Sequence, residues 1–311
     1  MSRTDYASAV AAVKTMESSL LTHSDIEQLI NTNTLAEMKT LMDAKLTAPA
    51  TMEEVWNMLS GYAPDNQALS ILLYKNDFHN LKAVLKALLS GRDPANYYIS
   101  PSNVPLSVLT EAFSAKDYEL LPKYMRFTAE EAYELATRTL DGQLSDSLID
   151  SAALRAMQES ADASGSEFMK KYALLTAVCA DIKTAYRCSI MMKQRQFLEN
   201  AICGSADLDK ETLVRAALAG TESLFSMLEA TVYSEAASLL KEAPAQFEKW
   251  CDDIMIEHAE SARLQAFGIE PLAAYYIAKE TELKNIRILS VCKECGTDRL
   301  TITERMRKLY V

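Results

Sequence analysis

The feature that most constrains the fold is a short polar, aliphatic and basic pattern that occurs three times along the chain. Its occurrences are Asn80-Leu81-Lys82, Asp181-Ile182-Lys183 and Asn285-Ile286-Arg287. The copies lie about one hundred residues apart, whereas the repeats of a solenoid have periods of about 20–50 residues. The spacing therefore predicts one domain used three times, with boundaries at 1–104, 105–205 and 206–311.

Each copy lies inside a longer stretch with the pattern of a helix. Residues 74–92 surround the first copy with apolar side chains at steps of three and four, and residues 172–187 and 275–296 surround the others. The chain of 311 residues has only 8 glycines and 8 prolines, which favours helices. Turn-forming residues gather at 91–105 and 204–209, where we expect the repeats to meet. We therefore predict an all-α protein.

The repeated polar positions have two interpretations. In the first, their side chains form hydrogen bonds and ion pairs that fix how each long helix packs, because buried polar groups need partners. In the second, they face a partner: three copies closed around a pseudo-threefold axis would place Lys82, Lys183 and Arg287 around a central opening that fits a shaft. The third copy also contains charges at pairing distance, Lys279 with Glu282 and Glu280 with Lys284.

The charge balance limits the partners. The chain has 43 acidic and 32 basic residues, a net charge of −11, which repels phosphate backbones and anionic membrane surfaces. Nucleic acid is therefore not an expected partner. No apolar run approaches the roughly 18–20 residues of a membrane helix, and the first five residues lack the apolar core of a signal peptide. We expect a cytoplasmic protein.

The sequence has few signs of catalytic chemistry. It contains no glycine-rich run that would cradle a nucleotide, no histidines at paired metal-binding spacing and no nucleophile elbow. We therefore predict no catalytic residue, cofactor, bound metal or small-molecule substrate. Cys292 and Cys295 form a single C-x-x-C motif. Zinc binding would need a second pair of ligands, and a redox thiol normally lies in a thioredoxin-like αβ fold, and the sequence shows neither. A place on a helix face is the simpler interpretation.

Three stretches resemble the C subunits of V/A-type ATPases, whose eukaryotic equivalent is the d subunit. They are Lys75–Lys82, Phe267–Arg287 and the tail Ile302–Tyr310. The likeness covers nearly the whole chain and includes its three-part organisation. It is weakest in the middle copy, where Val178–Ile182 stands in place of the run Ile-Asp-Leu-x-Asn-Ile that family members often carry.

The resemblance implies a funnel of three similar helical domains around a central cavity. Such a protein sits on the membrane proteolipid ring and receives the central shaft of the soluble ATPase head. It would transmit torque for H⁺ or Na⁺ transport, or for ATP synthesis, without catalysing a reaction, and would be peripheral to the membrane through its complex. Two alternatives from other classes are a free-standing helical adaptor in the cytosol and a thiol enzyme using Cys292 and Cys295.

Overall fold

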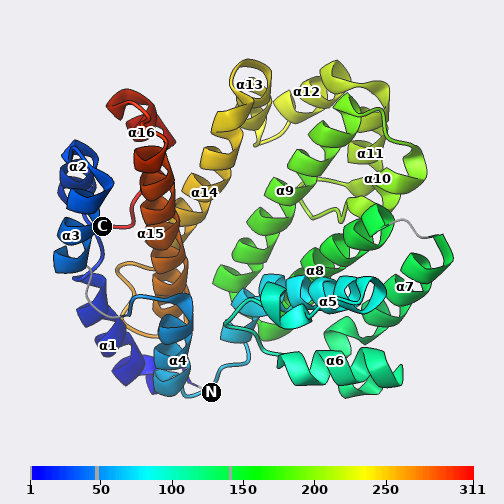
Figure 1. Cartoon of the computed structure of the whole chain (residues 1–311), viewed down its shortest axis with the longest axis horizontal. Coiled ribbons are helices and arrows are strands. Elements are labelled where there is room, and N and C mark those ends of the chain that lie inside the picture. Colours follow the sequence, from blue (N-terminus) through cyan, green and yellow to red (C-terminus); the bar gives the residue numbers. More distant parts are fainter. Residues whose placement is uncertain (1, 46–48, 140–141) are drawn as a thin grey trace. The chain divides into compact units, whose positions relative to one another are not determined.

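The computed structural model describes residues 2–45, 49–139 and 142–311, and in these ranges it contains helices and no strand (Figure 1). The predicted all-α class is confirmed. Backbone contacts group the chain into two compact units. Unit 1 comprises Met1–Leu69 and Glu242–Val311, and unit 2 comprises Ser70–Lys241. The boundaries 1–104, 105–205 and 206–311 and the funnel stay predictions.

Unit 1 is built around one long helix, α15 (Glu270–Glu294). Every residue from 270 to 279 is buried, so this part of α15 contacts protein on all sides. Helices α1, α3, α4, α14 and α16 contact it. The other helices of unit 1 are η1 (Arg3–Tyr6), α1 (Ala7–Glu17), α2 (His23–Asn31), α3 (Leu35–Lys45), α4 (Met52–Tyr62), α14 (Pro244–Glu260) and α16 (Arg299–Arg305).

The C-terminal part of α15 belongs to an apolar core that the chain's two ends build together. Leu289 and Cys292 of α15 pack there with Leu29 of α2, Met38 of α3 and Ile302 of α16, all at most 2 % exposed. Burying side chains of this size stabilises the fold by about 1.5–3 kcal/mol each. Residues near the two ends of the sequence therefore share one core.

A buried ion pair lies near the middle of α15. Lys279 and Glu282 pair one helical turn apart, with side chains 1 % and 3 % exposed. The second carboxylate oxygen of Glu282 accepts a hydrogen bond of 2.6 Å from the backbone N–H of Leu21. The pairing predicted for Lys279 is confirmed. Lys284, which we expected to pair with Glu280, pairs with Asp252 of α14 at 2.7 Å, because α14 packs against α15.

Unit 2 is built around two consecutive long helices, α8 (Gly142–Ser164) and α9 (Glu167–Ile190) (Figure 1). Gly165 has a positive φ of 68°, which favours glycine, and lets the chain reverse between them. The other helices of this stretch are η2 (Leu69–Leu73), α5 (Tyr74–Ser90), η3 (Pro94–Tyr97), α6 (Leu106–Ala115), η4 (Tyr118–Leu120), α7 (Lys123–Thr139), α10 (Arg195–Ala201), α11 (Lys210–Ala219), α12 (Thr221–Glu229) and α13 (Ser234–Glu242). Helices α5, α7 and α10 pack on α8, and α11 and α12 pack on α9. Among the described residues, no helix has both the length and the apolar character needed to cross a membrane.

The Lys279–Glu282 pair generates a stability prediction. Glu282→Gln keeps an acceptor for Leu21 but leaves the Lys279 ammonium buried without a counter-charge, which typically costs about 3–5 kcal/mol. We expect that loss in the free energy of unfolding, measured by urea denaturation. The double variant Lys279→Met, Glu282→Gln should recover most of it.

The matched control is Glu167→Gln, because Glu167 pairs with Lys170 at the same spacing but is 84 % exposed. Its cost should stay below about 0.5 kcal/mol. Equal costs for Glu282→Gln and Glu167→Gln would contradict the buried-pair account.

Candidate functional site

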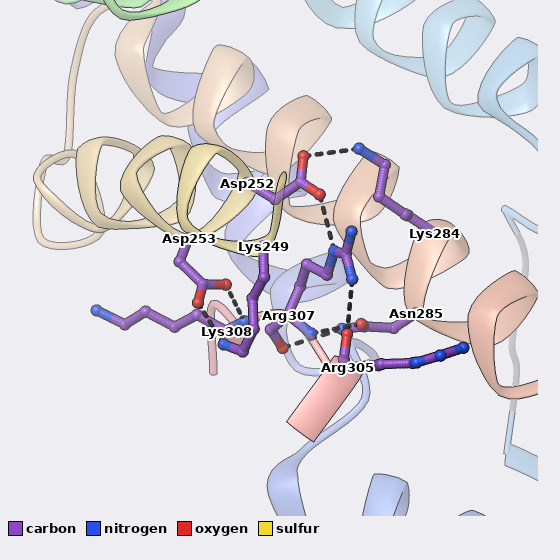
Figure 2. Close-up of polar contacts among 8 residues, drawn as sticks. All are labelled: Lys249, Asp252, Asp253, Lys284, Asn285, Arg305, Arg307 and Lys308. Carbon is purple, nitrogen blue, oxygen red and sulfur yellow. Dashed lines mark hydrogen bonds and ion pairs between the residues drawn. The ribbon is translucent and has the colours of Figure 1, made fainter. Parts of the chain in front are cut away.

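Two of the three repeated polar positions make the same contact. The Asn80 side chain of α5 is fully buried and hydrogen bonds to both backbone groups of Ile99, donating to its carbonyl at 2.9 Å and accepting from its N–H at 2.8 Å. Asn285 of α15 does the same with Arg307, at 3.2 Å and 2.8 Å (Figure 2). In both copies the amide side chain fixes an irregular segment that lies 19 to 22 residues further along the chain.

The middle position makes the corresponding contact with a carboxylate. Asp181 of α9 is 1 % exposed, and its two oxygens accept hydrogen bonds from the backbone N–H groups of Cys203 at 2.9 Å and Gly204 at 2.7 Å. An amide suits one N–H and one carbonyl, whereas two N–H donors require two acceptors. The two N–H groups that residues 203 and 204 offer therefore explain why the middle copy has Asp where the other two copies have Asn. We call these three contacts the segment clasps.

Burial changes the acidity of the Asp181 clasp. Loss of water around the carboxylate raises the pKa of Asp181 to about 6, against an ordinary value of 3.8. The two N–H donors and the charge of Lys210 act in the opposite direction but do not cancel the effect of burial.

The basic positions of the repeat differ from one another in their surroundings. Lys82 forms an ion pair of 2.6 Å with Asp150 of α8. Lys183 is half-buried, and Arg287 is exposed on α15. The segment clasps use the polar member of each triplet inside a unit, and the basic member lies nearer the surface.

A second contact on α5 includes residues that the sequence reasoning missed. Asp77 is fully buried and accepts hydrogen bonds from the Tyr124 hydroxyl at 2.8 Å and from the backbone N–H and side-chain amide of Asn103, both at 2.7 Å. Asn76 donates to the carbonyl of Pro101 at 2.8 Å. Burial and the proximity of Asp77 raise the pKa of Tyr124. The only sequence signal was the polar run Asn76-Asp77 inside an apolar helix.

The tail of the chain is held to α14 by charge (Figure 2). Asp252 accepts from Arg307 Nε at 2.8 Å and pairs with Lys284, while Asp253 accepts from the backbone N–H of Lys308 at 2.6 Å and pairs with Lys249. The two adjacent carboxylates thus anchor the segment that the Asn285 clasp also holds. Their contacts are structural, with three basic side chains and one backbone amide.

The C-x-x-C cysteines lie in different surroundings. Cys292 is buried in the apolar core of unit 1, and Cys295 is exposed just beyond the end of α15. Within the described ranges, no three His, Cys, Asp or Glu side chains gather closely enough to hold a metal ion.

Comparison with known families identifies the class of this protein. The model of the ATP synthase (C/AC39) subunit family matches residues 9–305. The chain therefore belongs to that family, the C subunits of V-type ATPases, and the resemblance inferred from the sequence is confirmed.

One curated relative is similar along its whole length. It is the C subunit of the V-type sodium ATPase of Enterococcus hirae, 24 % identical over 320 residues, with 96 % of this chain and 97 % of the relative covered. The family match includes the Asn80 and Asp181 clasps completely. It includes Asn285 of the third clasp but not its partner Arg307, which lies beyond residue 305.

The Asn285 clasp generates a prediction about side-chain chemistry. In Asn285→Asp, the carboxylate would face the carbonyl of Arg307 without a donor, so the variant should lose about 3 kcal/mol of unfolding free energy at pH 7.5. A protonated Asp can donate to that carbonyl, so most of the loss should disappear at pH 5. Urea denaturation followed by circular dichroism measures both values, with exposed Asn57→Asp as the control. A loss that is the same at both pH values would refute the assignment.

The Asp181 clasp generates a prediction about pH. Because its folded pKa of about 6 exceeds the ordinary 3.8, the folded state binds a proton that the unfolded state lacks between these values. Stability should therefore fall as pH rises through this window, by about 3 kcal/mol at most. Urea denaturation between pH 4.5 and 7.5 should show this fall in unfolding free energy in the native chain and a smaller fall in Asp181→Asn. In the control Asp43→Asn, whose side chain is exposed, the fall should equal that of the native chain. Equal slopes in the native and Asp181→Asn proteins would contradict it.

Proposed function

We propose that this protein is the non-catalytic coupling component of the central stalk in a rotary V/A-type ATPase. It joins the rotating shaft of the soluble head to the membrane proteolipid ring and transmits torque for H⁺ or Na⁺ transport. Its place is cytoplasmic and peripheral to the membrane, through the complex. The observation that carries the proposal is the family match over residues 9–305.

The segment clasps support this role physically. A coupling has to transmit force without letting its elements slide, and close-packed helices deform little. Each of the three helices α5, α9 and α15 is long and fixes the irregular segment that follows it through buried hydrogen bonds. Irregular segments would otherwise be the most compliant parts of such a chain.

The clasps also suggest that the polar and the basic positions of the repeated triplets have different roles. Asn80, Asp181 and Asn285 are used internally, which agrees with the structural interpretation of the polar positions. The basic positions Lys82, Lys183 and Arg287 lie nearer the surface, and we propose that they contact the shaft or the ring. A threefold arrangement around the shaft would bring them to a common opening, as the repeat predicts.

Depletion of this chain from the purified complex tests the proposal. We expect ATP hydrolysis by the head to continue at a similar rate while ATP-driven ion transport into vesicles is lost, because the rotor is uncoupled. Adding the protein back should restore transport.

Two results would contradict the coupling role. Loss of ATP hydrolysis together with transport would indicate a part in catalysis, and unchanged transport would indicate an adaptor outside the rotor. Cys292→Ser, Cys295→Ser provides the matched add-back control and should restore transport as well as the native protein does.

A further inference from the structure

One face of α5 in unit 2 is left open as a groove. Its volume is about 560 Å³, and α5 contributes residues at steps of three and four between His79 and Ser90. The other wall comes from residues 96–99, at the end of η3 and directly after it. Ala83 and Ala87 form part of the floor and are buried, so a partner's backbone can approach closely. The side chain of Tyr97, at the rim, is 47 % exposed.

A second groove lies on the other side of a ridge of ion pairs. Lys82 and Lys86 line the first groove and pair with Asp150 and Asp146 of α8 at 2.6 and 2.5 Å. These two aspartates line a groove of about 400 Å³, whose far wall includes Met191 and other residues at the C-terminal end of α9. The two grooves are joined by these ion pairs, and we call them together the α5–α8–α9 face.

The charge of this face is opposite to that of the chain. Five lysine and arginine side chains line the two grooves, against two aspartates, in a protein with net charge −11. Lys82 and Lys86 are neutralised by the aspartates. The side chain of Arg187 forms no hydrogen bond or ion pair with the described residues, and the side chain of Arg92 reaches only the Tyr97 hydroxyl, at 3.5 Å. The three surplus positive charges therefore lie at Arg92, at Arg187 and at Lys193, whose ammonium donates to the neutral side-chain amide of Gln143 at 2.7 Å.

The composition of the face is that of a protein interface. Tyrosine, arginine, methionine and phenylalanine are enriched at binding hot spots and interface cores, and the grooves present Tyr97, Arg187, Met191 and Phe197. A flat anionic bilayer would not follow two grooves, and it would meet the exposed carboxylate of Asp150 on the ridge.

We propose that the α5–α8–α9 face docks an acidic helical segment of a protein partner. The segment lies along α5 over its alanines, and its carboxylates meet Arg92, Arg187 and Lys193. Electrostatic complementarity of this kind raises the association rate and fixes the register of binding. The inference rests on the proposed function, since the partner is then another component of the ATPase.

Zero-length cross-linking of the assembled complex tests the docking. A water-soluble carbodiimide joins a lysine to a carboxylate in direct contact, and mass spectrometry identifies the joined residues. We expect Lys193, whose ammonium donates to the neutral side-chain amide of Gln143, to be joined to an aspartate or glutamate of another protein of the complex. Lys82 and Lys86 should join to Asp150 and Asp146 within the chain and serve as internal controls. Absence of a cross-link from Lys193 to another protein would overturn the proposal.

Charge reversal provides the second measurement. Arg92→Glu, Arg187→Glu removes no internal ion pair, and it should lower the affinity for complex depleted of this chain by at least about tenfold. The control Lys39→Glu, Lys123→Glu makes the same charge change at exposed lysines outside the face and should bind like the native chain. Native affinity of the Arg92, Arg187 variant would overturn the docking surface.

Two further outcomes separate this inference from the proposed function. A native chain that copurifies with no other ATPase component would overturn both, whereas a chain that copurifies without a cross-link from Lys193 to another protein would overturn the docking surface alone. Sedimentation with phosphatidylglycerol vesicles that the arginine reversal abolishes would assign the face to a membrane surface instead.

Discussion

The rest of this structure depends on buried side chains that hold backbone rather than other side chains. Asn80, Asp181 and Asn285 each lie inside a long helix and bind the segment that returns 19 to 23 residues later. An unpaired polar group at such a depth would cost about 1–3 kcal/mol, so each contact strongly favours one position of the returning chain. The same solution occurs after α5, α9 and α15, which gives a physical meaning to the repeat seen in the sequence.

The sequence was sufficient for the class of fold, because helical periodicity and the scarcity of glycine act locally. It also located the three polar positions and offered the structural interpretation that the clasps support. It did not reveal their partners, since Ile99, Gly204 and Arg307 take part through backbone groups that every residue has. The departure of the middle copy, which looked like a loss of the pattern, is a chemical adjustment to two N–H donors.

Charge is used in two ways in this chain. Inside unit 1, Lys279 and Glu282 are so deeply buried that each charge needs the other as its counter-charge. Asp252 and Asp253 bind the tail of the chain. On unit 2, basic side chains gather around two grooves although the whole chain is acidic. Neither the tail anchor nor the grooves were visible as a motif, because their members are far apart in the sequence and meet only through packing. The periodicity of apolar residues predicts helices, but it does not predict which charged helix faces pack against one another.

Amide hydrogen exchange measures directly whether the segment clasps hold the backbone. The amides of Ile99, Gly204 and Arg307 lie in irregular segments, yet the account predicts that they exchange slowly in the native protein. Asn80→Ala should speed exchange at Ile99 and leave Arg307 protected, and Asn285→Ala should do the reverse. Exchange of these amides in the native chain at the rate of exposed loop amides would contradict the account.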